Sequence, residues 1–296
     1  LHNEIYTPED IATVLSLAVN EKNFTGSNKG EKFLNVPVSF DIETTSFYRD
    51  EDGETYSYER YMKLGGKQTK MEKCSLMYVW QFGINGFCIL GRTWVEFLNM
   101  LAEIVAILEL CPKKRIIIYV HNLAYEFQFF RELLDWEKVF SIDLRKPIYG
   151  ITKTGLEFRC SYLLSGYSLA KLGEQLHKYK CEKLVGDLDY SLLRHSETPL
   201  TQKEIGYCLN DIKVVMCYIQ ELIEQYKGIT RLPITKTGFV RKYCRSVCFK
   251  TTDETGKTIP NFKYIDKIHS LNITGLDEFS MLQRAFSGGF THANAK

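Results

Sequence analysis

The sequence predicts an α/β fold in which a central sheet has helices packed on its faces, and three observations support this. The apolar run at residues 33–47 has the length and composition of a strong strand. Two β-rich runs meet at Asn85-Gly86, a dipeptide typical of a tight hairpin turn. The short apolar run at residues 115–120 leads directly into a segment with helical spacing. Strands that alternate with helices favour a sheet covered by helices.

Capping and turn residues predict the other elements in chain order. Thr7-Pro8-Glu9-Asp10 places an N-cap, a proline and an acid where a helix of about ten residues would start. The charged, glycine-containing stretch 48–73 predicts a long excursion or a hairpin loop. The remaining expected elements are a capping-box helix from Thr93 to about Leu110, two β-like runs within 138–164, a short helix at 168–176, and a capping-box helix from Thr201 to about Tyr226.

Composition and charge exclude several classes of protein. Hydrophobic residues make up 45% of the chain and charged residues 25%, as in an ordinary globular protein. No apolar run approaches the roughly 18 residues of a membrane-spanning helix, so we expect no membrane partner. Nine scattered cysteines favour a reducing compartment, the cytoplasm, over a disulfide framework. Cys244 and Cys248 lack the second Cys/His pair of a zinc site. With a net charge of only +2, any bound nucleic acid has to lie in a local groove.

A pair of acids stands at the tip of the first strong strand. Because side chains alternate along a strand, Asp41 and Glu43 point the same way. Two adjacent carboxylates repel each other unless a divalent cation lies between them, and hard oxygen ligands suit Mg²⁺ or Mn²⁺. The same Asp-x-Glu pattern recurs at Asp52 and Glu54, where a solvated turn is the simpler interpretation. Only the first copy lies on an apolar strand.

The second motif is the stretch YVHNLAYEFQFF. Helical spacing predicts a common face for Asn122, Tyr125, Glu126 and Phe129. Aromatic rings with an amide and an acid suit a pocket that holds a single nucleic-acid strand. The alternative is a boundary helix of mixed burial.

The third motif, Tyr207 with Asp211, places a phenol and a carboxylate one helical turn apart. Tyr48 and Asp52 repeat this spacing in the charged stretch, and an ordinary helix surface is the alternative. The three motifs together supply four carboxylates and a phenol. Such a set can hold two cations that activate a water and stabilise the leaving oxygen in phosphodiester hydrolysis.

The three motifs resemble those of the 3′–5′ exonucleases with four acids and a tyrosine, which are also called DEDDy or DnaQ-like. FDIETT, HNLAYE and YCLND are similar to the first, second and third exonuclease motifs. The finer resemblance is to protein-primed family B DNA polymerases of bacteriophages and linear plasmids, through HNL, SLAKL, VGDLDY and FSGGF. The resemblance implies a ribonuclease H-like fold with a mixed central sheet.

The resemblance also implies roles for individual residues. Two Mg²⁺ or Mn²⁺ ions would be held by Asp41, Glu43, Glu126 and Asp211, and Tyr207 would orient the attacking water. The residues implied to grip the 3′ end of single-stranded DNA are Thr44, His121, Asn122, Tyr125, Phe129, Ser168, Leu169 and Tyr190.

The resemblance divides the chain into three parts. Residues 1–35 are expected to form a helical extension and linker, residues 36–228 the exonuclease domain, and residues 229–296 a helical, basic connector. The polymerase motifs of the family do not occur in this sequence, so we expect the chain to be the N-terminal part of a longer polymerase. Proofreading, primer-template DNA, a terminal protein as primer and the host cell cytoplasm would then belong to the parent enzyme. In the connector, TKTGFVRKYCR either contacts phosphates or forms a solvated helix face.

The sequence departs from the family pattern at three positions. Glu126 stands where the second motif normally ends in Asp, Val185 stands where a lysine is usual while Lys183 lies two residues earlier, and Phe286 replaces a tyrosine. Two alternative functions follow. One is an exoribonuclease of the same superfold, and the other is a catalytically weak exonuclease-like domain that only binds DNA.

Overall fold

The computed structural model describes residues 4–143, 145–184, 192–271 and 275–285, which form parts of two compact units, residues 1–236 and 237–296. The strands of the first unit are β1 Ile5–Tyr6, β2 Phe24–Gly26, β3 Lys32–Leu34, β4 Val38–Arg49, β5 Thr55–Tyr56, β6 Glu72–Ile84, β7 Phe87–Gly91, β8 Lys114–Val120, β9 Trp136–Ser141, β10 Pro147–Thr152 and β11 Leu156–Cys160. Its α-helices are α1 Ile11–Ala18, α2 Tyr58–Lys63, α3 Trp94–Ile107, α4 Leu123–Phe130, α5 Ser161–Ser165, α6 Leu169–Glu174 and α7 Gln202–Tyr226. Short 3₁₀ turns are η1 Pro8–Asp10, η2 Glu21–Asn23, η3 Gly66–Gln68 and η4 Ile229–Arg231.

The main sheet is mixed, as predicted. Its strands run in the order β1-β7-β6-β4-β8-β11-β10-β9. β4 lies between β6, with which it pairs antiparallel, and β8, with which it pairs parallel. The strand that carries the first acidic motif therefore lies inside the sheet, with a hydrogen-bonded neighbour on each side.

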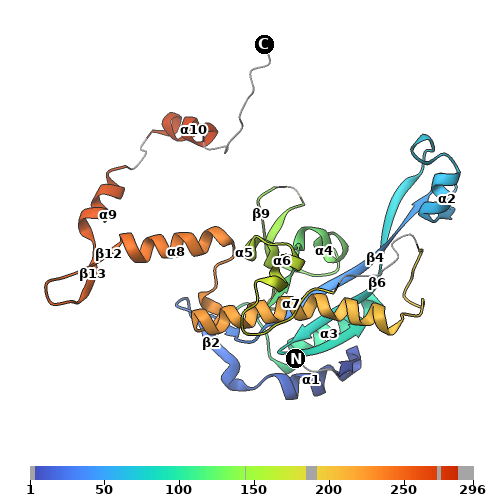
Figure 1. Ribbon diagram of the computed structural model, residues 1–296, viewed down its shortest axis with the longest axis horizontal. Coiled ribbons are helices and arrows are strands. Elements are labelled where there is room, and N and C mark those ends of the chain that lie inside the picture. The colour runs from blue at the N-terminus through green and yellow to red at the C-terminus, as the bar shows by residue number, and fades with distance from the viewer. Residues whose placement is uncertain (1–3, 144, 185–191, 272–274, 286–296) are drawn as a thin grey trace, which may run out of the picture. The chain divides into compact units, whose positions relative to one another are not determined.

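The first strong strand is divided and extended relative to the prediction. Pro37 separates β3 from β4, because proline supplies no N–H to a ladder. β4 continues past the predicted end to Arg49, paired with the start of β6. The stretch 48–73 thus forms the tip of a long hairpin, which carries α2 and projects beyond the rest of the sheet (Figure 1). The rings of Tyr48 and Tyr61 stack 3.7 Å apart and attach α2 to the hairpin.

Helices cover both faces of the sheet. On one face, Phe40 stacks on Phe97 of α3 at 4.5 Å, and α1 packs beside α3 in the same core. α7 lies on the opposite face and crosses β4 and β6 (Figure 1). A Cβ on Gly83 would lie 2.6 Å from the side chain of Met216, so this glycine permits α7 to approach β6 closely.

The predicted capping and turn signals are present. Thr7 forms a capping box with Asp10, and η1 continues directly into α1. Asn85 and Gly86 both have positive φ in the β6–β7 turn. Capping boxes begin α3 at Thr93 and α7 at Thr201.

The assignment of residues 1–35 to an extension and of residue 228 to a domain boundary stays a prediction.

Three strands, β9 to β11, overlap the segment 138–164, where two were predicted, and α5 follows them. β9 forms an exposed edge of the sheet, so its residues show little apolar alternation. β10 and β11 are joined by a tight turn in which Gly155 has φ +94°. A Cβ at this glycine would also meet the backbone of Cys111 at 2.5 Å, which excludes other residues.

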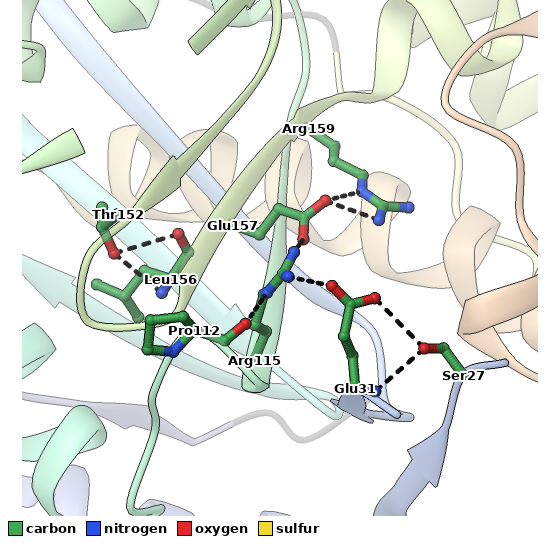
Figure 2. A network of polar contacts seen from close by, with 8 residues as sticks. All are labelled: Ser27, Glu31, Pro112, Arg115, Thr152, Leu156, Glu157 and Arg159. Carbon is green, nitrogen blue, oxygen red and sulfur yellow. Dashed lines mark hydrogen bonds and ion pairs between the residues drawn. The ribbon is translucent and has the colours of Figure 1, made fainter. Parts of the chain in front are cut away.

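A partly buried network of ion pairs joins the sheet to the β2–β3 segment (Figure 2). Glu157, 3% exposed, lies between Arg115 at 3.1 Å and Arg159 at 2.7 Å. Arg115 also pairs with Glu31 and donates to the carbonyl oxygen of Pro112 at 2.6 Å. Because each charge has a partner, burial of this group is tolerated.

The second unit has its own elements, which include two strands as well as helices. They are α8 Lys236–Cys248, β12 Lys250–Thr252, β13 Thr258–Pro260, α9 Phe262–His269 and α10 Leu276–Ala285, with α8 beginning at the last residue of the first unit. β12 and β13 pair as an antiparallel hairpin, which the weak periodicity of this region did not indicate. Among the described residues, no helix has the length and apolar character needed to cross a membrane.

Candidate active site

Three acids converge where β4 faces α7. Asp41 and Glu43 occupy alternate positions of β4 and point toward the helix, which carries Asp211. One carboxylate oxygen from each of the three lies within 4.8 Å of the others. Glu43 and Asp211 are buried, whereas Asp41 is partly exposed. Carboxylates that are held this close repel one another unless protons or cations lie between them.

Glu126 approaches the same group from α4. It lies in the first turn of α4, is 5% exposed, and its carboxyl group lies close enough to that of Asp41 for each to shift the pKa of the other. The helical face predicted for this motif is only partly formed. Asn122 precedes the helix in the left-handed conformation, with φ +69°, because the chain turns sharply between β8 and α4. Tyr125 is exposed while Glu126 is buried, so the two side chains lie in different environments.

Burial raises the pKa of every acid in the group. The pKa of Asp41 rises to about 7, through desolvation and the charge of Asp211, and that of Asp211 rises to about 6 through desolvation. Desolvation followed by the charge of Asp41 also raises the pKa values of Glu43 and Glu126. The site therefore favours protons or another positive charge between its carboxylates.

Lys183 supplies such a positive charge. Its Nζ lies 3.3 Å from Oδ2 of Asp211 and 5.5 Å from the centre of the Tyr207 ring. This charge lowers the pKa values of Asp41, Glu43 and Asp211 against the effect of burial. In the sequence, Lys183 lies two residues before the position where the family usually has a lysine. Val185, which stands at that position, lies outside the described residues.

Gln81 and His121 also contact the site. Gln81, fully buried on β6 opposite Asp41, donates to its Oδ2 at 3.1 Å. Sequence reasoning missed Gln81, although a lone amide in the apolar run MYVWQFGI was a usable signal. His121 bonds to Ser161 through Nδ1 at 3.0 Å, and burial lowers its pKa to about 4, so the ring is neutral.

A cavity of about 170 Å³ opens onto the acids. It is lined by Ser39, Phe40, Asp41, His121, Leu169, Lys183, Asp211 and Val215. Leu169 and His121, both predicted to contact DNA, thus lie beside two of the predicted metal ligands.

The other predicted DNA contacts fall into separate places. Thr44 on β4 bonds to the hydroxyl of exposed Tyr125, whose ring lies 5.3 Å from that of Phe129, so these three form one group. Ser168 caps α6 and is exposed, accepting from the backbone of Lys171. Tyr190, like Phe286 of the linker motif, lies outside the described residues.

The donor set fits hard divalent cations. Four carboxylates supply oxygen ligands of the kind that Mg²⁺ and Mn²⁺ prefer. Glu126 Oε2 and Asp211 Oδ1 are buried without a hydrogen-bond partner among the described residues. A bound cation would satisfy atoms that are otherwise costly to bury.

The raised pKa values predict how stability depends on pH without divalent ions. Asp41 and Asp211 titrate at about 7 and about 6 in the folded protein and near 3.8 in an unfolded chain. The folded state therefore binds more protons between these values, so its free energy of unfolding falls as pH rises through that window. Urea unfolding in a chelator should show this slope, and an Asp41→Asn/Asp211→Asn variant should reduce it. If the variant shows the same dependence of unfolding free energy on pH as the wild type, the raised pKa values do not belong to Asp41 and Asp211.

The mixed sheet with helices on both faces forms a DnaQ-like α/β fold of the ribonuclease H-like class, as predicted from sequence. Part of "Phi29 DNA polymerase complexed with primer-template DNA and incoming nucleotide substrates" aligns at TM-score 0.50 and 13% identity, over 72% of this chain and 34% of that chain. The complex of the same polymerase with single-stranded DNA gives 0.49 at 13% identity, over 71% and 35% of the two chains. The catalytic core of RRP6 from Trypanosoma brucei gives 0.38 at 11% identity, over 77% and 50%.

The first of these alignments, at a TM-score of 0.50, shows that the two chains share a fold. The chain spans about a third of the Phi29 polymerase chain that it matches. No family model and no curated protein matched the sequence.

Proposed function

We propose that the chain is a metal-dependent 3′–5′ exonuclease that removes nucleotides from single-stranded DNA. The observation that carries this proposal is the meeting of acids from three elements, β4, α4 and α7, beside a cavity. Asp41, Glu43, Glu126 and Asp211 would hold Mg²⁺ or Mn²⁺. When bound, two such ions supply an activated water and stabilise the leaving oxygen in phosphodiester hydrolysis.

The residues around the acids have roles that fit a DNA end. The rings of Tyr125 and Phe129 offer surfaces on which bases stack, a contact worth about 1–3 kcal/mol per base. Thr44, whose hydroxyl already meets Tyr125, would contact the terminal nucleotide. His121, neutral and with a buried Nε2 that has no partner among the described residues, would accept or donate one hydrogen bond in the cavity. Tyr207 would orient the attacking water.

We further propose that the exonuclease belongs to a protein-primed family B DNA polymerase of a virus or linear plasmid. The support is the set of sequence motifs that resemble that family, together with the fold shared with part of the Phi29 polymerase. In the parent enzyme the site would proofread primer-template DNA, and a terminal protein would serve as primer.

Matched DNA and RNA substrates test the proposed activity. We expect stepwise shortening of a 5′-labelled single-stranded DNA from its 3′ end in Mg²⁺ or Mn²⁺, and slower trimming of RNA of the same sequence. Equal or faster trimming of RNA would indicate an exoribonuclease. DNA binding without cleavage would indicate a catalytically weak binding domain. Either result would overturn the proposal.

A Glu126→Asp variant tests whether the longer side chain is required. Asp is usual at this position in the family, but here Glu126 reaches Asp41 from α4 and is buried there. Removing one methylene withdraws the carboxyl group by about 1 Å, a displacement that can lower a rate about 100-fold. We expect such a loss in kcat on single-stranded DNA. A variant as fast as the wild type would show that α4 accommodates either acid.

A further inference from the structure

A strap of residues 177–184 runs from α6 to the site and is attached to α7 at two places. At its start, the backbone N–H groups of residues 177–179 donate to the carboxylate of Glu221 at 2.6–2.9 Å. Lys178 pairs with Glu224 of the same helix at 2.6 Å, and the hydroxyl of Tyr179 donates to Glu224. The beginning of the strap is therefore fixed to the last turns of α7.

The second attachment is Asn210, one residue before Asp211. Its side-chain oxygen accepts from the backbone N–H of Leu184 at 2.8 Å. Its amide nitrogen donates to the carbonyl oxygen of Glu182 at 3.1 Å and to the sulfur of Cys181 at 3.7 Å. The two backbone contacts lie on either side of Lys183. A single side chain thus fixes the peptide groups that flank this lysine.

The opposite side of the strap is packed against α6. A Cβ on Gly173 would lie 2.9 Å from the carbonyl oxygen of Cys181 and 3.1 Å from the backbone nitrogen of Lys183. A side chain at this position would have to displace the strap backbone. The segment that carries Lys183 is consequently held between a glycine of α6 and Asn210 of α7.

From these contacts we infer that Asn210 is a positioning residue, which sets the Lys183 ammonium against Asp211 in the active site. This inference rests on the proposed nuclease function. Lys183 Nζ lies 3.3 Å from Asp211 and lines the cavity, so its charge is placed where phosphate groups would enter. A lysine side chain has four rotatable bonds, so its charge stays at one place only when its backbone is fixed. Asn210 and Asp211 are adjacent on α7, so the same helix positions both the Asp211 carboxylate and the Lys183 ammonium.

A double-mutant cycle on single-stranded DNA tests this inference. Lys183→Met and Asn210→Ala should each lower kcat about 10- to 100-fold with KM changed less than about threefold. The double variant should be no slower than Lys183→Met alone, because without the lysine there is no charge to position. Gly173→Ala should lower kcat in the same way. Gln202→Ala, an exposed amide on the same helix, should match the wild type.

Mn²⁺ titration provides a second measurement that does not require cleavage. A cation fixed beside Asp211 repels a divalent ion, so Lys183→Met and Asn210→Ala should both bind Mn²⁺ several-fold more tightly, and the double variant no more tightly than Lys183→Met. Additive effects, or Asn210→Ala behaving like Gln202→Ala in both measurements, would overturn the inference. An inactive wild type with the expected Mn²⁺ pattern would instead count against the nuclease function alone.

Discussion

The Asp41→Ala/Glu43→Ala variant is expected to lose at least about a thousandfold in the rate of single-stranded DNA hydrolysis. The two carboxylates provide half of the proposed cation ligands, and both lie on β4, where no other acid can take their place. Charge stabilisation by a bound cation is worth several kcal/mol, and each 1.36 kcal/mol corresponds to a factor of ten in rate. The rate of release from a 3′-labelled oligonucleotide in Mg²⁺ measures the loss.

The sequence itself contains a matched control for this variant. Asp52→Ala/Glu54→Ala removes the second Asp-x-Glu pair, which is exposed at the tip of the hairpin and should leave the rate unchanged. In the absence of divalent ions, Asp41→Ala/Glu43→Ala should melt no lower than the wild type, because it removes carboxylates that repel Asp211. Equal degradation by the wild type and Asp41→Ala/Glu43→Ala would show that the hydrolytic site lies elsewhere.

The second large effect is expected on stability, at the ion-pair network of Figure 2. Glu157→Ala should lower the free energy of unfolding by about 3–5 kcal/mol, the usual cost of removing one partner from a buried ion pair. The reason is that Arg159 and Arg115, 11% and 14% exposed, would both lose the carboxylate between them. Urea unfolding monitored by circular dichroism gives the value.

An exposed ion pair provides the control for Glu157→Ala. Glu132 is 81% exposed and pairs with Arg131 at 3.0 Å, so Glu132→Ala should change the free energy of unfolding by less than about 0.5 kcal/mol. A loss below about 1 kcal/mol in Glu157→Ala would mean that water or structural relaxation solvates the arginines. The network would then not stabilise the pairing of β8 with β11.

The elements with strong local signals could be predicted from the sequence. Capping boxes began two helices at Thr93 and Thr201, and Asn85-Gly86 formed the expected turn. The end of β4 at Tyr48 and Arg49 could not be predicted, because these residues are stabilised by pairing with β6 and by the stacking of Tyr48 on Tyr61. Two strands instead of three were predicted within 138–164, where the exposed edge strand β9 shows little apolar alternation.

The candidate site also combines features that are visible in the local sequence with contacts that only the tertiary fold creates. The three acidic motifs were visible because each lies on a regular element. Their convergence depends on how α7 crosses β4, which no local pattern records. Lys183 could not be assigned from its offset in the sequence, because its position follows from the attachment of its backbone to Asn210. Gln81 contacts Asp41 only through strand pairing.

Release of the 3′-terminal nucleotide tests the central claim most directly. The chain is mixed with 3′-labelled single-stranded DNA in Mg²⁺, then with excess chelator, and finally with Mg²⁺ or Mn²⁺ restored. We expect the label to appear as a nucleoside monophosphate, to stop appearing in the chelator and to resume when the ion returns. Release that continues at the same rate in the chelator, or no release with either ion, would contradict a metal-dependent exonuclease built on Asp41, Glu43, Glu126 and Asp211.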